Sequence, residues 1–223
     1  MITQMSSKTS QLPSLSFEQT LNARYIIGID EVGRGCIAGD VAVGAVLIDL
    51  ENLSEWPVKL QDSKLLTPKS RTAMFAEVSN WAKSWSVGLA SVEEIEQQGI
   101  ISALGLAASR ALMEVANSNA KELTEFPTVI LLDGNQDYLG TKSMGFRVQT
   151  KIKADQDCVS VAAASVLAKV TRDNLMVEIS QTYPQYALDS NKGYASADHI
   201  KGLKEHGPSP IHRLSWLTKI LAE

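Results

Sequence analysis

The run from Tyr25 to Gly35 constrains the fold of this chain more than any other stretch. Its first five residues are apolar or β-favouring around one glycine, a pattern typical of a strand buried on both faces. The run then reaches two adjacent carboxylates, Asp30 and Glu31. Successive strand residues point to opposite faces, so we expect the strand to stop here and both carboxylates to serve one site at its end.

The residues that follow are Gly33, Arg34 and Gly35. The two glycines predict a turn with uncovered backbone N–H groups, which a phosphate or a sugar could approach closely. Arg34 offers a forked donor suited to phosphate oxygens. The acid pair alone is more typical of a polar turn after an ordinary strand, but the Gly-Arg-Gly continuation favours a metal bound against a phosphate.

Composition predicts one soluble globular domain. The chain has 223 residues, of which 44% are hydrophobic and 21% charged. We expect no membrane-spanning segment, because a charge or a glycine interrupts every apolar run within about 18 residues.

Residues 1–22 are rich in Ser, Thr and Gln and predict a flexible N-terminal extension to a catalytic domain at 23–223. Cys36 and Cys158 lack metal-site spacing, which favours a reduced, cytoplasmic compartment; we expect a monomer.

Charge is distributed unevenly along the chain. The net charge of −4 argues against bulk electrostatic binding of nucleic acid, but residues 1–141 carry −7 and residues 142–223 carry +3. A basic second half could supply phosphate contacts while the first half supplies acids, although chance could also produce this asymmetry. The three histidines, His199, His206 and His212, lack ligand spacing and are predicted to have structural or surface roles.

Strand and helix patterns alternate along the chain. Strands are predicted near 25–29, 40–48, 85–90, 128–132 and 145–150, and helices near 68–83, 101–117, 160–173 and 196–205, with a short acidic helix that Ser91 caps. The short link between the first two strands favours an antiparallel hairpin. The pattern predicts a three-layer α/β fold with a central mixed five-stranded sheet and a helical C-terminal region.

Further carboxylates follow the first pair. The apolar strand 128–132 also ends in an acid, Asp133, and Asp155 precedes a helix of small residues. Taken alone, Asp155 is more typical of a capping residue than of a ligand. Asp30, Glu31 and Asp133 would nevertheless come from strand ends that could meet, with Asp155 nearby. Carboxylates without His or Cys predict a hard oxygen site for Mg²⁺ or Mn²⁺ rather than zinc.

With these residues in view, the chain resembles bacterial ribonuclease HII from about Tyr25 to Trp216. The resemblance rests on ordered blocks: Gly28–Gly35, Asp62–Lys64, Leu132–Asn135, Lys153–Asp155, Ala162–Asp173, Lys192–Tyr194 and His212–Arg213. It implies an RNase H-like fold, a four-carboxylate site for a divalent metal, and cleavage of RNA–DNA hybrids and of single ribonucleotides in duplex DNA. By position, it places the catalytic and metal-binding acids at Asp30, Glu31, Asp133 and Asp155.

The resemblance also implies residues that bind substrate. Gly33, Arg34 and Gly35 match the loop that reads the ribose 2′-OH, and Tyr194 matches a tyrosine that senses the RNA–DNA junction. Without the resemblance, Tyr194 is better read as an ordinary loop aromatic packed on the domain. Lys64 is predicted to contact phosphate, with a merely solvated side chain as the alternative.

Some positions depart from the family pattern. Cys36 and Asp40 stand where the family usually has proline, Leu65 replaces a frequent lysine, and Leu214 and Trp216 replace Arg and Phe. We expect Leu65 and Leu214 to weaken the grip on the nucleic-acid backbone without affecting catalysis.

Two other functions remain open from the residues alone. One is a different RNase H-like nuclease, such as a junction resolvase, which the Gly-Arg-Gly and Gly-Tyr motifs disfavour. The other is a catalytically silent binding module on the same fold, which the presence of all four acids disfavours.

Overall fold

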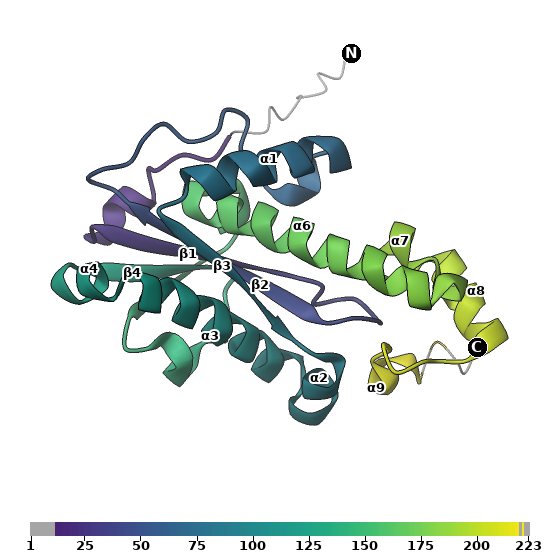
Figure 1. Cartoon of the computed structure of the whole chain (residues 1–223). Helices are drawn as coiled ribbons and strands as arrows, with labels where there is room; N and C mark the ends of the chain where they lie inside the picture. Colours follow the sequence, from purple (N-terminus) through teal and green to yellow (C-terminus); the bar gives the residue numbers. More distant parts are fainter. Residues whose placement is uncertain (1–11, 219, 221–223) are drawn as a thin grey trace, which may run out of the picture.

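A mixed five-stranded sheet with helices on both faces forms the centre of the molecule (Figure 1). The structure, a computed structural model, describes residues 12–218 and 220. The strands are β1 (Tyr25–Val32), β2 (Val41–Asp49), β3 (Ser84–Ala90), β4 (Thr128–Asp133) and β5 (Arg147–Lys151), in the order β3-β2-β1-β4-β5. Strand β1 pairs antiparallel with β2 and parallel with β4. The predicted three-layer fold, mixed sheet and early hairpin are confirmed.

Some of the helices begin at a side-chain cap that the sequence provides. The helices are α1 (Pro68–Trp81), α2 (Val92–Gln98), α3 (Ile100–Ser118), α4 (Ala120–Glu125), α5 (Ala154–Asp157), α6 (Val159–Thr182), α7 (Leu188–Asn191), α8 (Ala197–His206) and α9 (Leu214–Leu217). The Thr67 hydroxyl caps α1 with Pro68 in the first turn, and Ser91 with Glu94 forms a capping box on α2. Helix α6 and, above it, α1 cover one side of the sheet, and α3 covers the other (Figure 1).

The two faces of β1 enter different parts of the core. Tyr25, Ile27 and Ile29 pack with residues of α3, whereas Ile26 packs with residues of α6. Between them, Gly28 lies so close to α6 that a Cβ there would overlap the backbone of Ser160. Small residues on both elements therefore bring α6 against the sheet, as the sequence predicts.

Helix α3 is long and apolar. By length and composition alone Ile100–Ser118 is the one helix of the described residues that could cross a membrane, although Gly105, Arg110 and Glu114 interrupt its apolar run, as expected. Half of its apolar window is buried within the protein, where Ala107, Ala111 and other small residues pack on the sheet. Its apolar character is thus used in the core.

The predicted flexible extension requires a correction at its C-terminal end. Residues 1–11 lie outside the described residues and Leu12 is exposed, but from the buried Pro13 onward the chain is packed on the domain. The Ser14 N–H donates to the Asp157 carbonyl at 3.0 Å. The fully buried Glu18 carboxylate accepts from the Ser160 backbone N–H and from its hydroxyl, both at 3.1 Å. The sequence of this segment looks polar because the apolar residues that pack on the core, such as Leu21, are widely spaced in it.

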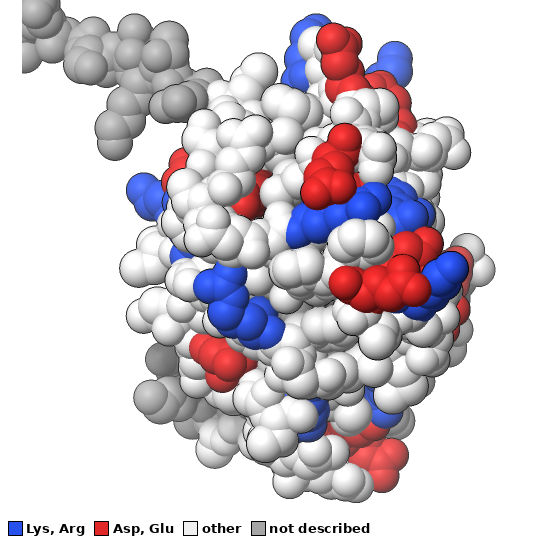
Figure 2. Space-filling model, turned by 90° about the vertical axis from the view of Figure 1, so that its left-hand side faces the viewer, with Lys and Arg blue, Asp and Glu red and all other residues white. Residues whose placement is uncertain are grey.

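The end of the sheet where β1 and β4 begin, near α4, carries charges of both signs. Figure 2 shows Lys and Arg interspersed with Asp and Glu on this face, without a large basic patch. Just before β1, Arg24 pairs with Asp49 at 2.9 Å and with Glu51 at 3.2 Å. This end of the sheet therefore lacks the concentrated positive charge that would hold nucleic acid by bulk electrostatics.

Candidate active site

Two acids lie side by side at the carboxyl ends of β1 and β4. The parallel pairing of these strands ends at Ile29 and Leu132, so Asp30 and Asp133 are the next residues on neighbouring strands. The carboxyl edge of parallel strands is where α/β folds place their ligands. This juxtaposition was predicted from the acids that follow the two apolar runs.

One detail of that prediction is wrong, because β1 does not stop at the acid pair. It continues to Val32, held by its antiparallel pairing with β2. Asp30 and Glu31 therefore leave the strand on opposite faces, Asp30 on the α6 side and Glu31 on the α3 side. Both reach one site only because the pairing with β4 has already ended, which opens this edge of β1.

Asp155 joins the acids from the connection between β5 and α6. Lys153 adopts a left-handed backbone conformation (φ 61°), and the short helix α5 then begins. The backbone N–H of Asp155 donates to Asp133 Oδ1 at 3.3 Å. The structure thus brings together Asp30, Asp133 and Asp155, with Glu31 at the same edge; we call these four residues the acid edge.

The acid edge holds negative charge that the fold does not neutralise. Burial, followed by the charges of Glu31 and Asp133, raises the pKa of Asp30 well above its ordinary value. Burial, with Asp133 and Asp62 adding to it, raises the pKa of Asp155 to about 6. Raised carboxyl pKa values mean that ionising the site costs free energy, which a bound cation would recover.

Lys64 is the nearest cation to the acid edge. Its ammonium lies 3.3 Å from Asp155 Oδ2 and 4.0 Å from Asp62 Oδ1. Burial alone would lower the pKa of Lys64, but the charges of Asp30, Asp62 and Asp155 outweigh it and raise the pKa. The neighbouring Ser63 N–H donates to Ser165 Oγ of α6 at 3.2 Å, which anchors the segment.

The two glycines of the Gly-Arg-Gly loop differ in what surrounds them. Gly33 has φ +85°, and a Cβ there would overlap the guanidinium of Arg172, so the fold itself requires glycine. Gly35 is exposed, does not adopt a positive φ, and would have no atom within 4 Å of an added Cβ. Gly33 alone supplies the turn, and the space beside Gly35 is open to a ligand. Arg34 points into solvent, with Nη1 3.4 Å from Glu31 Oε1.

The loop that contains Tyr194 lies directly against the Gly-Arg-Gly loop. The backbone N–H groups of Ile37 and Ala38 donate to the Gly193 carbonyl at 2.9 and 3.3 Å. The Tyr194 ring is 44% exposed, and the Lys169 ammonium lies 6.0 Å from its centroid. The sequence could not show that these two loops meet.

Four buried cationic or titratable residues hold these loops, and sequence reasoning gave none of them this role. We call Arg172, Arg213, His199 and His212 the arginine–histidine cluster; all four are at most 1% exposed. Arg172 donates to the carbonyls of Asp40, Lys192 and Ala38 at 2.7, 2.8 and 3.1 Å. Arg213 donates to the carbonyls of Arg34 and Gly39 at 3.0 and 2.8 Å. The only sequence signal is that Arg172, His212 and Arg213 fall in the motif blocks; His199 lies outside them.

Two departures from the family pattern, Cys36 and Asp40, lie beside the same loops. Cys36 is buried, with Sγ 3.6 Å from the Lys192 carbonyl, and Asp40 accepts a hydrogen bond from the Val92 N–H at 3.3 Å. Leu65 and Leu214 are exposed, so a lysine or an arginine at either position would reach solvent. The weaker grip expected from these two leucines stays a prediction.

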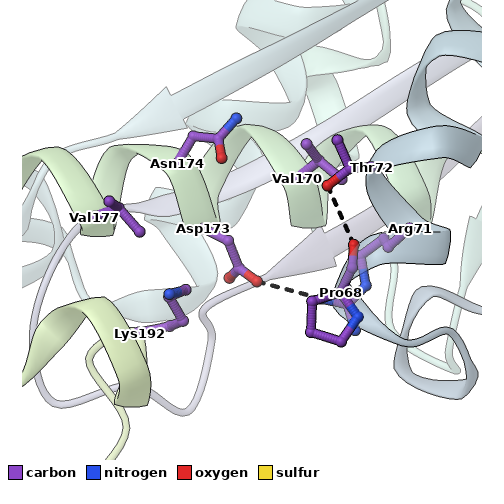
Figure 3. Close-up of a pocket in the computed structure, with 8 residues that line it drawn as sticks. All are labelled: Pro68, Arg71, Thr72, Val170, Asp173, Asn174, Val177 and Lys192. Carbon is purple, nitrogen blue, oxygen red and sulfur yellow. Dashed lines mark hydrogen bonds and ion pairs between the residues drawn. The ribbon is translucent and has the colours of Figure 1, made fainter.

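A groove lies between α1 and α6. It has a volume of about 170 Å³ and is lined by Pro68, Arg71, Thr72, Val170, Asp173, Asn174, Val177 and Lys192. Figure 3 shows Arg71 and Asp173 facing each other across it, and these side chains pair at 3.4 Å. Lys192, on its lower side, is two residues before Tyr194. Charges in the groove are thus largely paired with one another.

The acid edge suits a hard divalent cation by its chemistry, although it is not closed around one. Among the residues described, no three His, Cys, Asp or Glu side chains are arranged to hold a metal ion. Closely spaced like charges repel, so closing the site would require the cation itself. The buried Tyr138 hydroxyl has no hydrogen-bond partner within residues 12–218 and 220, and burial, followed by the charge of Glu31, raises its pKa. The all-oxygen donors and this orphaned hydroxyl fit a site that a bound group completes.

Comparisons with known proteins agree with this geometry. The family model for Ribonuclease HII matches residues 27–219. The ribonuclease HII of Streptomyces coelicolor is 46% identical over 201 residues, which cover 90% of this chain and 80% of the relative. The crystal structure of ribonuclease H2 from Pyrococcus horikoshii superposes with a TM-score of 0.69 at 26% identity and covers 89% of this chain and 97% of that one.

A more distant structure supports the fold alone. Bst-RNase HIII, solved in complex with Mn²⁺, has a TM-score of 0.71 at 20% identity and covers 97% of this chain and 75% of that one. The sequence matches, by contrast, extend over nearly all of the described domain, including every motif block. The chain therefore belongs to the ribonuclease HII family and is an endonuclease that acts on RNA–DNA hybrids.

Proposed function

We propose that this enzyme cleaves at the acid edge, with a divalent cation as cofactor, and that it also incises duplex DNA at single embedded ribonucleotides. One observation carries the proposal: Asp30 and Asp133 end up adjacent on parallel strands, and Asp155 is hydrogen-bonded to Asp133. This arrangement gathers carboxylates at an open strand edge beside an exposed loop. It would have no evident benefit for folding, because it raises the pKa values of Asp30 and Asp155.

Asp30, Glu31, Asp133 and Asp155 would hold the cation. Mg²⁺ and Mn²⁺ are the candidates, since both prefer carboxylate oxygens. When bound, such an ion polarises a phosphate oxygen and lowers the pKa of a coordinated water. Support for a metal also comes from the Mn²⁺ complex of Bst-RNase HIII, which shares the fold.

The chain's own side chains would orient the scissile phosphate. Arg34 is exposed at the loop tip and is only loosely paired with Glu31 at 3.4 Å, so its guanidinium is free to turn toward phosphate oxygens. Lys64 is already drawn toward the acid edge by Asp155. Substrate would find one positive group on each side of the carboxylates. No histidine belongs to the acid edge, and proton removal from water would therefore rely on the cation.

Recognition of a single ribonucleotide would rest on the two adjoining loops. Only the 2′-OH distinguishes a ribonucleotide in a DNA duplex, and this group both donates and accepts hydrogen bonds. The open space at Gly35 lets backbone groups approach it, and the exposed Tyr194 ring could lie against the neighbouring sugar. A 2′-OH on that next nucleotide would crowd the ring, which favours cleavage at RNA–DNA junctions.

The test is an incision assay with matched 5′-labelled duplexes. One substrate contains a single ribonucleotide, the second is a continuous RNA–DNA hybrid, and an all-DNA duplex is the control. We expect wild-type enzyme with Mg²⁺ or Mn²⁺ to cut the first two and spare the third, and Asp133→Asn to cut none. Near wild-type activity of Asp133→Asn would refute the assignment of the acid edge, whereas cleavage of the hybrid alone would refute single-ribonucleotide incision.

A cytoplasmic monomer is proposed as the working form. Both cysteines are buried and free, as a reducing compartment favours. Light scattering coupled to gel filtration should give a mass near 24.2 kDa. A mass twice as large would show a dimer.

A further inference from the structure

A chain of hydrogen bonds connects the C-terminal segment to Tyr194. The Ser209 N–H lies 3.0 Å from His212 Nδ1, and His212 Nε2 lies 3.0 Å from His199 Nε2. On the other side of its ring, His199 Nδ1 lies 2.8 Å from the Tyr194 carbonyl. The chain thus crosses two buried imidazoles and ends on the backbone of the residue proposed to sense the junction.

The end groups of this chain determine where each proton lies. A backbone N–H can only donate, so the Ser209 N–H makes His212 Nδ1 an acceptor and leaves the proton on His212 Nε2. Ser209 makes two further contacts with His212 Nδ1: its hydroxyl, which can donate, lies 3.1 Å away, and its carbonyl, which could only accept, lies farther at 3.2 Å. His212 Nε2–H then donates to His199 Nε2, which leaves the His199 proton on Nδ1. At the far end the Tyr194 carbonyl can only accept, which agrees with this assignment.

The surroundings of the two rings keep them neutral. Tyr186 packs against both, with ring centroids 4.6 Å from His212 and 5.9 Å from His199. Burial lowers the pKa of both histidines, to about 4 for His212. In the part of the chain that the structure describes, neither ring pairs with a carboxylate that could stabilise its charged form; His206, the third histidine, is exposed. Only neutral rings allow the donor–acceptor order just described.

We infer that His199 is a positioning residue for Tyr194, and that His212 holds it in the tautomer that donates from Nδ1. Tyr194 follows Gly193, which has φ +87° and accepts from Ile37 and Ala38. The loop is therefore fixed on one side by these bonds and on the other by His199. The donated bond sets where the exposed ring stands relative to Gly35. This inference rests on the proposed role of Tyr194 in substrate recognition.

The first test reads the protons directly on the wild-type protein. The chain has three histidines, so ¹⁵N-detected histidine spectra at pH 7 are simple to assign with one variant per residue. We expect a proton on Nδ1 of His199 and on Nε2 of His212, with both rings neutral. A proton on Nε2 of His199, or a charged ring at either position, would overturn the inference without any reference to activity.

The second test uses a matched pair, His199→Asn and His199→Leu. Both lose the bond to His212, but the asparagine amide can still donate from the position of Nδ1 to the Tyr194 carbonyl. We expect His199→Leu to lower cleavage at a single ribonucleotide, relative to the continuous hybrid, by about three- to tenfold, as for one lost hydrogen bond. His199→Asn should retain most of the wild-type ratio, and thermal melts of both variants monitor folding.

Tyr194→Ala, measured in parallel, separates failure of this inference from failure of the proposed function. If Tyr194→Ala changes the ratio but the two His199 variants behave alike, the positioning role is overturned and the proposed role of Tyr194 stands. If Tyr194→Ala lowers cleavage of both substrates equally, Tyr194 does not sense the junction, and the positioning role falls with it.

Discussion

The acid edge and the arginine–histidine cluster lie at the two ends of the Gly-Arg-Gly loop, and they treat buried polar groups in opposite ways. In the cluster, each guanidinium or imidazole donates to or accepts from a named backbone or ring partner. At the acid edge, carboxylates face one another, the Tyr138 hydroxyl has no partner, and the pKa values of Asp30 and Asp155 are raised. The cluster is complete as folded, whereas the acid edge requires a ligand.

This difference separates residues that shape the site from residues that act in it. A satisfied buried network stabilises one arrangement of loops, whereas unsatisfied like charges cost stability until a ligand arrives. We therefore expect substitutions in the two regions to have opposite effects on stability and activity. The following predictions test that contrast, from the largest effect to the smallest.

Asp30→Asn should abolish cleavage while the protein remains folded. The variant removes a buried carboxylate of the acid edge and keeps its size, so we expect activity to fall by at least about a hundredfold. Initial rates on the continuous hybrid, with Mg²⁺ or Mn²⁺ supplied, check this. Activity within a few-fold of wild type would place the catalytic site elsewhere.

Arg213→Met should destabilise the protein. It leaves the carbonyls of Arg34 and Gly39 without their side-chain donors, at a cost of about 1–3 kcal/mol for each buried group left unsatisfied. Urea unfolding with circular dichroism measures the change. An unchanged midpoint would mean that water satisfies these carbonyls, and that the cluster does not hold the loop.

A comparison of Gly33→Ala with Gly35→Ala sharpens the same contrast within one loop. The first substitution forces a side chain into a positive φ and against Arg172, so it should cost on the order of 1–3 kcal/mol of stability. The second meets no atom of the protein and should leave the melting temperature unchanged. Because its methyl group would stand where substrate approaches, Gly35→Ala should lower cleavage by about tenfold. Equal stability of the two variants would contradict this division.

The smallest effect concerns pH in the metal-free protein. The pKa of Asp155 is about 6 in the folded state against an ordinary 3.8, so the folded state binds a proton that the unfolded chain lacks between these values. The ionised Asp155 carboxylate therefore lowers the free energy of unfolding at high pH, and this penalty is removed as the pH falls through about 6. We expect Asp155→Asn to be at least as stable as wild type at pH 8 and to lose this advantage by pH 4.

His212 should respond to pH with the opposite sign. Its pKa is lowered to about 4 in the folded state, so the stability that neutral His212 provides above about pH 6.5 is lost as the pH falls toward 4.

Much of the fold could be predicted because local signals agree with the tertiary structure. The apolar strands, the Thr67 and Ser91 caps and the small residues of α6 each indicate their element without reference to distant residues. The acids of the candidate site were found for the same reason, since they follow apolar runs. The C-terminal end of β1 could not be predicted in this way. Its last residues are in the strand because they pair with β2, and their own sequence pattern does not indicate a strand.

The rest of the site depends on long-range contacts. Arg172 and Arg213 look like surface residues in sequence, and only folding shows that their guanidiniums bind carbonyls of a loop more than 130 residues away. The same holds for His199 and His212, which lack ligand spacing yet lie 3.0 Å apart. Residues 12–22 were expected to be flexible, because the pairing of Glu18 with Ser160 is invisible locally.

Thermal melting with and without Mn²⁺ tests the central claim most directly, namely that the acid edge is a cation site that is costly when empty. A ligand that binds only the folded state raises its stability, and Asn at position 133 retains the oxygen that accepts from the Asp155 N–H. The account predicts that Mn²⁺ raises the melting temperature of wild type but not of Asp133→Asn. It also predicts that the metal-free variant melts no lower than metal-free wild type. An equal Mn²⁺ shift in both proteins, or a clearly lower melting temperature of the metal-free variant, would contradict it.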